Sequence, residues 1–341
     1  MNLPAGHPPF ARRYLVGLAG TVVGVVLALD AMADDTVLVG AADAVRAFAV
    51  DNGRLLWLAL PGLNPDRPAA SGELVMVGSS GGLYALELAS GAPRWRLAST
   101  AQVFSPLIAG DTAYAGSVDG ELRAISLDDG DLRWRHRFPG WVYSPALAAD
   151  TLVVGGQAKS LWGLAPDSGR VRWSLPLPQE LVHQPLALDA ARVLITLFDG
   201  RVRALAAADG ETLWEVREPV PCQRPIPVQG LLVYACLDGR IVARGPAAGA
   251  LRWAVSLPGI DPLSLVPTAS GVLVRRDGEL LELDARHGGI RWRAAFTGSP
   301  LGAPGVRGAE VFQPVRRLAP SGGYSATVLR WRLQPAEEVK R

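Results

Sequence analysis

The chain has 341 residues, of which 19% are charged, and its formal net charge at pH 7 is +2. Its 34 lysine and arginine residues include only two lysines, Lys159 and Lys340, and they form no basic run. This composition argues against a nucleic-acid partner.

The N-terminus, residues 1–33, resembles a bacterial export signal. Arg12-Arg13 precede an apolar stretch from Leu15 to Leu29, and Ala31-Met32-Ala33 fits a small-x-small cleavage pattern. A transmembrane helix needs about 20 apolar residues, more than this stretch offers. The motif Leu27–Ala31 is repeated at Leu186–Ala190. The stretch therefore has a second interpretation, in which its end is a first strand and the rest is an uncleaved inner-membrane anchor.

Residues 34–333 carry a regular repeat in which a glycine is followed four residues later by a tryptophan. Successive tryptophans are 38, 39, 39, 41, 39 and 39 residues apart, and a further step of 39 reaches Trp331. The repeat tryptophans are Trp57, Trp95, Trp134, Trp173, Trp214, Trp253, Trp292 and Trp331. A period near 40 residues is typical of β-propellers. Residues 334–341 form a polar tail.

One repeat shows the expected blade. The pattern predicts strands over Val103–Ile108, Thr112–Gly116, Leu122–Leu127 and Leu132–Phe138, with a primed hairpin turn at Asp119-Gly120. Four antiparallel strands make one propeller blade. We therefore expect an all-β propeller with eight blades, or seven if the C-terminal segment completes the first blade.

The repeated residues have structural explanations. A tryptophan fills the gap between neighbouring blades, and its indole N–H needs an acceptor such as a carbonyl of the next repeat. The glycine allows a left-handed turn. Cys222 and Cys236 lie on either side of a turn at Gln229-Gly230 at nearly equal distances, so they face each other across a hairpin and can form a disulfide.

A binding surface is expected where the first strand enters each blade. A proline recurs at this entrance, as at Pro106, Pro145, Pro185 and Pro225. The residues just before it differ between repeats, unlike the framework positions, and should gather at the mouth of the axial channel. They are Phe104, Trp141, Tyr143, His183 and Arg224. The alternative interpretation is that these side chains only fill the channel and bind no partner.

The segment Leu83–Trp95 resembles the tryptophan-docking repeat of the PQQ-like propellers, and the resemblance covers about residues 36 to 333. That superfamily includes quinoprotein dehydrogenases, which hold PQQ and calcium, and cofactor-free scaffolds of the BamB type. BamB-like proteins work at the periplasmic face of the outer membrane and dock onto the barrel-assembly machinery.

The scaffold branch fits the residues better. The four histidines have no metal-ligand spacing, no acidic cluster suits calcium, and no catalytic motif is visible. We therefore expect no catalytic residues, no metal and no cofactor. The expected protein is a periplasmic, membrane-peripheral scaffold, monomeric within a complex. The alternatives are a PQQ-dependent dehydrogenase and a scaffold of another envelope assembly, such as polysaccharide export or a sensor complex. The missing lipid-anchoring cysteine departs from the BamB pattern.

Overall fold

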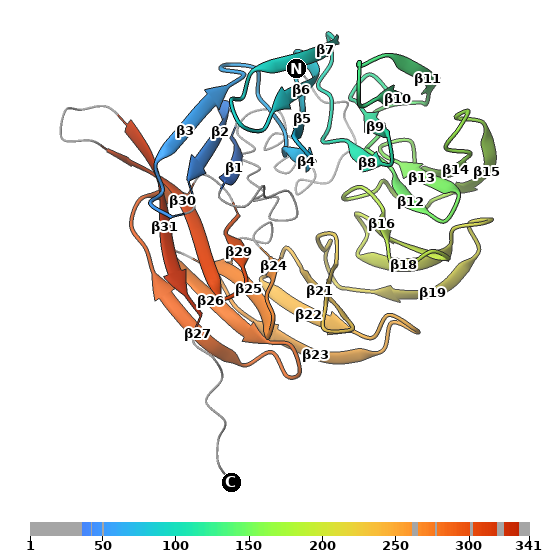
Figure 1. Cartoon of the computed structure of the whole chain (residues 1–341). Helices are drawn as coiled ribbons and strands as arrows, with labels where there is room; N and C mark the ends of the chain where they lie inside the picture. Colours follow the sequence, from blue (N-terminus) through green and yellow to red (C-terminus); the bar gives the residue numbers. More distant parts are fainter. Residues whose placement is uncertain are drawn as a thin grey trace, which may run out of the picture.

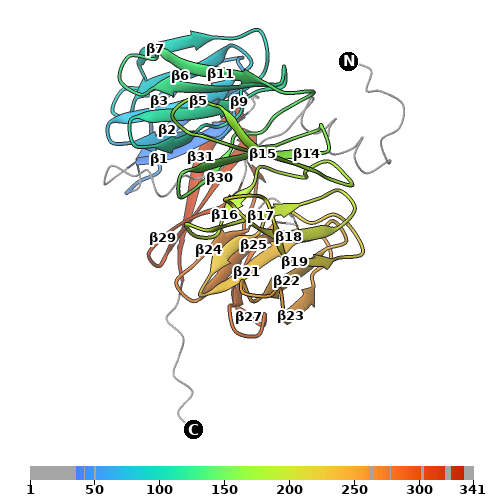
Figure 2. The same cartoon turned by 90° about the vertical axis from the view of Figure 1, so that its right-hand side faces the viewer.

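The computed structural model describes residues 36–41, 43–49, 51–260, 265–276, 278–300, 303–318 and 324–333. Their strands form eight antiparallel sheets around one axis, which we number blades 1 to 8 in chain order (Figure 1). Seen from the side, neighbouring blades stand face to face around the ring (Figure 2). The predicted eight-bladed, all-β propeller is confirmed. The expected export signal, the Leu27–Ala31 motif and the tail 334–341 lie outside the described residues.

Blades 2 to 7 each contain four strands in sequence order, running from the axis outward. Blades 2, 3 and 4 are β4 Ala69–Ser71, β5 Leu74–Ser79, β6 Gly82–Glu87, β7 Pro93–Ala98; β8 Leu107–Ala109, β9 Thr112–Gly116, β10 Glu121–Ser126, β11 Leu132–Arg137; and β12 Ala146–Ala148, β13 Thr151–Gly155, β14 Ser160–Leu164, β15 Val171–Pro176. Blades 5, 6 and 7 are β16 Leu186–Ala187, β17 Arg192–Thr196, β18 Arg201–Ala206, β19 Thr212–Arg217; β20 Ile226–Val228, β21 Leu231–Ala235, β22 Arg240–Arg244, β23 Leu251–Ser256; and β24 Val266–Pro267, β25 Gly271–Arg276, β26 Glu279–Asp284, β27 Ile290–Ala295.

The core lies between the blades. The second and third strands are buried on both faces, as in β9 and β13, whose residues are all buried. Each interface from blades 1 and 2 through blades 7 and 8 is filled by its own cluster of apolar side chains. A single blade would expose these faces, so stacking around the ring stabilises the fold.

The Gly-x₃-Trp repeat works across these interfaces. Its glycines have φ between +66° and +79°, the left-handed region that the sequence predicted. A Cβ atom on the glycine of blades 2 to 7 would lie 2.5 to 2.9 Å from the tryptophan ring of the preceding blade. Six indoles donate to a carbonyl of the next blade over 2.7 to 3.0 Å. The motif therefore shapes a turn and also seats the neighbouring tryptophan.

Two details differ from the predicted repeat. The first strand of blade 3 is shorter than predicted and consists only of β8, Leu107–Ala109. Pro106 has no N–H to donate, so it separates β8 from an isolated bridge between Val103 and Ser117. The Asp119-Gly120 turn is not of the primed kind. The amide of Gly120 donates to Ser117 over 3.1 Å, and only the glycine has a positive φ.

The ring closes through an irregular pair of blades. Blade 1 has three described strands, β1 Thr36–Ala41, β2 Ala44–Ala49 and β3 Leu55–Ala59, of which β3 carries Trp57. Blade 8 contains β28 Ser299–Pro300 and β29 Gly305–Arg307, which both pair with β30 Glu310–Leu318, and then β31 Tyr324–Arg332. At the closing seam, the turn at Gly53 packs against Val328 of β31 rather than against a tryptophan.

Trp331 does not occupy the fourth-strand position that the sequence assigned to it. It lies on β31, which pairs directly with β30, and it faces Val311. Leu333 donates its amide to the carbonyl of Ala309 in blade 8, and Leu88 makes the equivalent bond to Glu73 in blade 2. Trp331, two residues before Leu333, therefore occupies the third-strand position that Leu86 occupies in blade 2. Strands β30 and β31 have nine residues each, so they contain the residues that would otherwise form a fourth strand. The 39-residue spacing between Trp292 and Trp331 is therefore a coincidence.

Candidate functional site

The innermost strands of blades 2 to 6 begin with the same backbone geometry. One amide at each entrance donates to the end of the second strand, and these bonds measure 2.8 to 3.0 Å. The donors are Asp66, Phe104, Tyr143, Val182 and Gln223. Of the residues that the sequence placed at the channel mouth, Phe104 and Tyr143 are themselves donors. His183 and Arg224 each follow the donor by one residue, and Trp141 precedes Tyr143 by two.

Three of the predicted residues are in contact. The ring centroids of Phe104 and Tyr143 are 5.2 Å apart, and those of Tyr143 and His183 are 6.4 Å apart. Tyr143 is buried, and burial, followed by the charge of Glu180, raises the pKa of its hydroxyl. Trp141 has no ring contact with this group among the described residues, and its carbonyl accepts the amide of Gln157.

Arg224 joins the group electrostatically together with Arg67, a residue that the sequence analysis did not single out. Burial, and then the charges of Arg67 and Arg224, lower the pKa of His183 to about 3. Burial and then Arg67 lower the pKa of Arg224 to about 10. We call Arg67, Phe104, Tyr143, His183 and Arg224 the axial cluster. The dipeptides Arg67-Pro68 and Arg224-Pro225 share one pattern, which could have identified Arg67.

Two further features lie in blade 6 and at its junction with blade 5. Cys222 and Cys236 form a disulfide across an isolated β-bridge, and the intervening turn at Gln229-Gly230 has positive φ at both residues. The carboxylate of Glu218 is 4% exposed and binds three partners, at 2.7 Å to Arg244, 2.8 Å to Tyr234 and 3.0 Å to Arg240.

The ionisation of Glu218 follows from these contacts. Burial opposes its charge, but the hydrogen bonds from Arg244, Tyr234 and Arg240 outweigh burial and lower its pKa. Glu218 directly follows β19 of blade 5 and its three partners belong to blade 6, so this ionised, buried network ties the two blades together.

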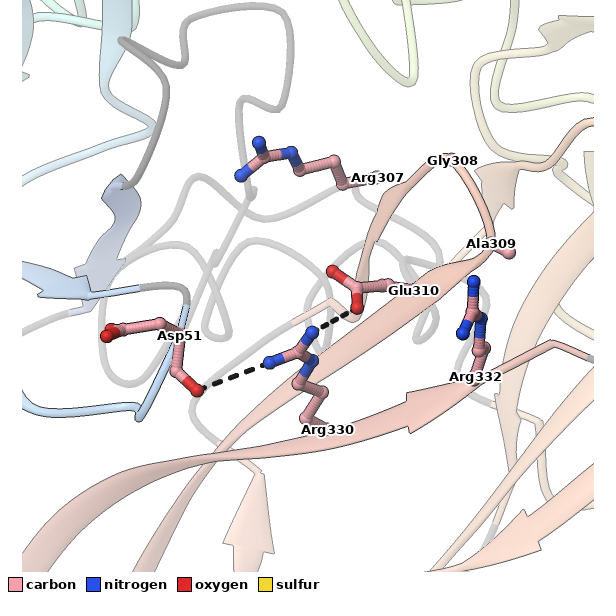
Figure 3. A pocket seen from close by; sticks show the side chains of 7 residues that line it. All are labelled: Asp51, Arg307, Gly308, Ala309, Glu310, Arg330 and Arg332. Atoms are coloured by element: carbon pink, nitrogen blue, oxygen red, sulfur yellow. Dashed lines mark hydrogen bonds and ion pairs between the residues drawn. The ribbon is translucent and has the colours of Figure 1, made fainter.

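The closing seam holds an arginine-rich pocket of about 450 Å³ between blades 8 and 1 (Figure 3). It is lined by Asp51, Arg307, Gly308, Ala309, Glu310, Arg330 and Arg332. Arg330 is ion-paired with Glu310 and donates to the carbonyl of Asp51 over 3.2 Å. Arg307 and Arg332 are exposed to solvent at its rim. This arrangement is a solvent-exposed basic surface, and the bond from Arg330 to Asp51 also fastens the two ends of the ring.

The outermost strand of blade 1 differs from those of the other blades. In β3, Leu56 and Leu58 flank Trp57 and are 39% and 47% exposed. In blades 2, 3 and 7 both flanking positions are exposed arginines, namely Arg94 and Arg96, Arg133 and Arg135, and Arg291 and Arg293. Charged side chains protect the free edge of a sheet from pairing with other chains. Blade 1 lacks that protection, and the pair Leu56/Leu58 was visible in the sequence as a break in the arginine pattern.

Within the described ranges, no three or more His, Cys, Asp or Glu side chains are grouped to hold a metal ion. The same part of the chain contains no helix long and apolar enough to cross a membrane.

Several solved structures of other proteins share this fold. The computationally designed Ika8 protein superposes with a TM-score of 0.74 at 17% identity, covering 89% of this chain and 95% of that chain. BamB from Moraxella catarrhalis gives 0.66 at 18% identity, covering 88% and 95%. The quinohemoprotein alcohol dehydrogenase from Comamonas testosteroni gives 0.67 at 15% identity, covering 89% and 74%. Among curated protein sequences, none matches this chain.

These low identities establish the architecture and do not separate a scaffold from an enzyme. The family profile described as "Outer membrane protein assembly factor BamB" is more specific, because it matches residues 41–140, 137–264 and 238–319. Together these segments span most of the ring, from β1 to beyond the end of β30. The chain therefore belongs to the BamB family of outer membrane protein assembly factors.

Proposed function

We propose that this protein is a non-enzymatic, periplasmic scaffold that supports the assembly of outer-membrane β-barrel proteins by binding a protein partner of the barrel-assembly machinery. Family membership supports the cellular role. Export would be directed by residues 1–33, either as a cleaved signal or as an inner-membrane anchor.

The observation that carries the scaffold role is the unprotected edge of blade 1. β3 is the terminal strand of its sheet, so its outer backbone groups have no neighbouring strand within that sheet. Leu56 and Leu58 are two residues apart and therefore lie on one face, opposite Trp57. A free edge with exposed leucines fits an extended strand of a partner, which gains main-chain hydrogen bonds and buries the leucines.

The test uses the tagged full-length chain and envelope extracts, with partners identified by mass spectrometry. Leu56→Arg introduces the residue type that blade 2 has at the matching position, Arg94. The matched control is Leu213→Arg, because Leu213 also precedes a fourth-strand tryptophan and is 47% exposed. We expect wild type and the control to recover barrel-assembly proteins. Leu56→Arg should recover about tenfold less, the change that corresponds to about 1.4 kcal/mol.

Equal recovery by Leu56→Arg and wild type would remove blade 1 as the docking edge. Recovery of a polysaccharide-export or sensor complex by wild type would contradict the barrel-assembly role and leave the scaffold role. Dye reduction by the purified protein with added PQQ, calcium and alcohols would instead establish the dehydrogenase alternative.

A further inference from the structure

Arg67 and Arg224 occupy equivalent entrance positions in blades 2 and 6. Each directly follows the residue whose amide binds the second strand, and each directly precedes a proline. Blades 2 and 6 are four blades apart in a ring of eight, so these two positions lie opposite each other across the axis (Figure 1).

Neither guanidinium has a hydrogen bond or ion pair anywhere in the described part of the chain, although both side chains are partly buried. Other half-buried arginines are neutralised: Arg123 pairs with Glu121 at 2.6 Å, and Arg244 pairs with Glu218 at 2.7 Å. A partly buried charge without a counter-charge destabilises the folded state. The arrangement is therefore explained more readily by a ligand than by packing.

The carboxylate nearest to Arg67 in sequence does not compensate it. Asp66 accepts the backbone amides of Arg67 and Ser105, at 2.8 and 2.9 Å, and forms no ion pair with the Arg67 guanidinium in the described part of the chain. The charge of Glu180 acts on Tyr143, and Glu180 forms no ion pair with Arg67 or Arg224 in the described part of the chain. The two charges that act on His183 are both positive, those of Arg67 and Arg224.

Uncharged donors lie at the same level. Gln223 is 4% exposed, and neither its Oε1 nor its Nε2 atom has a partner among the described residues. It stands in the register of Phe104 and Tyr143, the aromatic members of the cluster. The Tyr143 hydroxyl also makes no hydrogen bond in the described chain. A buried amide with both polar atoms unpaired points to a missing polar ligand.

We propose that this end of the axis is an anion-binding site in which Arg67 and Arg224 clamp a carboxylate or phosphate group from opposite sides. Guanidinium groups bind such oxyanions through paired, charge-assisted hydrogen bonds. The amide of Gln223 and the hydroxyl of Tyr143 supply further donors, and the Phe104 and Tyr143 rings provide an apolar wall. The anion belongs either to a small molecule or to an acidic side chain of a protein. This inference does not depend on the scaffold role or on the β3 edge.

The experiment measures the urea midpoint of the full chain with increasing citrate or inorganic phosphate, against sodium chloride at equal ionic strength. A ligand that binds only the folded state adds RT ln(1 + [L]/Kd) to the free energy of unfolding, so the midpoint rises as the ligand concentration exceeds Kd. A second arm measures binding of a labelled hexaglutamate peptide by fluorescence anisotropy. We expect wild type to respond to at least one of these anions, and the responding arm identifies a small-molecule or a protein-borne ligand.

Arg224→Gln and Arg67→Gln should each weaken anion binding by about tenfold or more, which is the loss of one charge-assisted contact. Without added anion, both variants should have a higher urea midpoint than wild type, because each removes one of two uncompensated charges. A structural role would lower the midpoint instead. Arg293→Gln, at an exposed arginine of β27, should match wild type in both measurements.

The proposal is overturned if wild type shows no anion-specific response in either arm. It is also overturned if both axial variants keep the wild-type response. Partner recovery from envelope extracts tests the β3 edge of blade 1, whereas anion binding tests the axial cluster. Failure of one proposal therefore leaves the other intact.

Discussion

Replacing one glycine of the repeat tests whether the motif seats the tryptophan of the preceding blade. Gly130 and Gly110 both have positive φ, +79° and +60°. A Cβ at Gly130 would lie 2.6 Å from Cδ2 of Trp95, whereas a Cβ at Gly110 meets nothing within 4 Å. Gly110→Ala is therefore a matched control with the same kind of backbone strain and no steric conflict.

The magnitudes separate the two effects. A non-glycine residue in the left-handed region costs about 1–2 kcal/mol, and both variants bear this cost. Gly130→Ala must also displace the Trp95 ring, and overpacking of this kind costs about 1–3 kcal/mol. Displacement strains the 2.9 Å bond from the indole to the carbonyl of Leu127, worth about 1 kcal/mol. We expect Gly130→Ala to exceed Gly110→Ala by about 2–4 kcal/mol.

The assay is urea unfolding followed by far-UV circular dichroism, with Trp95→Leu as the second mutation of a double-mutant cycle. If the conflict is steric, the smaller side chain should relieve part of it, and the two mutations will not be additive. Equal costs for Gly130→Ala and Gly110→Ala, or strict additivity in the cycle, would refute the reasoning.

Three other predictions concern the axis, the junction of blades 5 and 6, and the disulfide of blade 6. In the folded protein His183 has a pKa of about 3, so its imidazole stays neutral between pH 7 and pH 5. In the unfolded chain the same imidazole takes up a proton below about pH 6.5. The free energy of unfolding should therefore fall by about 2 kcal/mol from pH 7 to pH 5 on account of this group. Urea titrations at both pH values should show a smaller fall in His183→Gln, and an identical fall would contradict the assignment. Glu218→Gln should destabilise by about 3–5 kcal/mol because it leaves buried arginines unpaired, whereas the more exposed Glu215→Gln should cost about 1 kcal/mol or less, as measured by urea midpoints. The disulfide from Cys222 spans 14 residues, so Cys222→Ser should lose about 3 kcal/mol, and reductant should then have no additional effect on the variant.

Much of the fold was readable from the sequence because a blade is a local object. Turns, alternating strands and the Gly-x₃-Trp spacing all lie within about forty residues, and each pattern repeats. The strands of blade 3 accordingly lie within a few residues of their predicted ranges. Residue counting failed at Trp331, because a spacing records how far apart two residues are and not which strand pairs with which.

The candidate site depended on information that no single repeat contains. Phe104, Tyr143, His183 and Arg224 were identifiable because the residue type varies between repeats at the start of the first strand, but their neighbours come from other blades. That Arg67 stands opposite Arg224 follows only from closure into a ring of eight. The sequence by itself determined the blades, because their hydrogen bonds and turns are short-range. Tertiary structure alone decided which charges are left without partners around the axis, because burial and long-range pairing depend on how the ring closes.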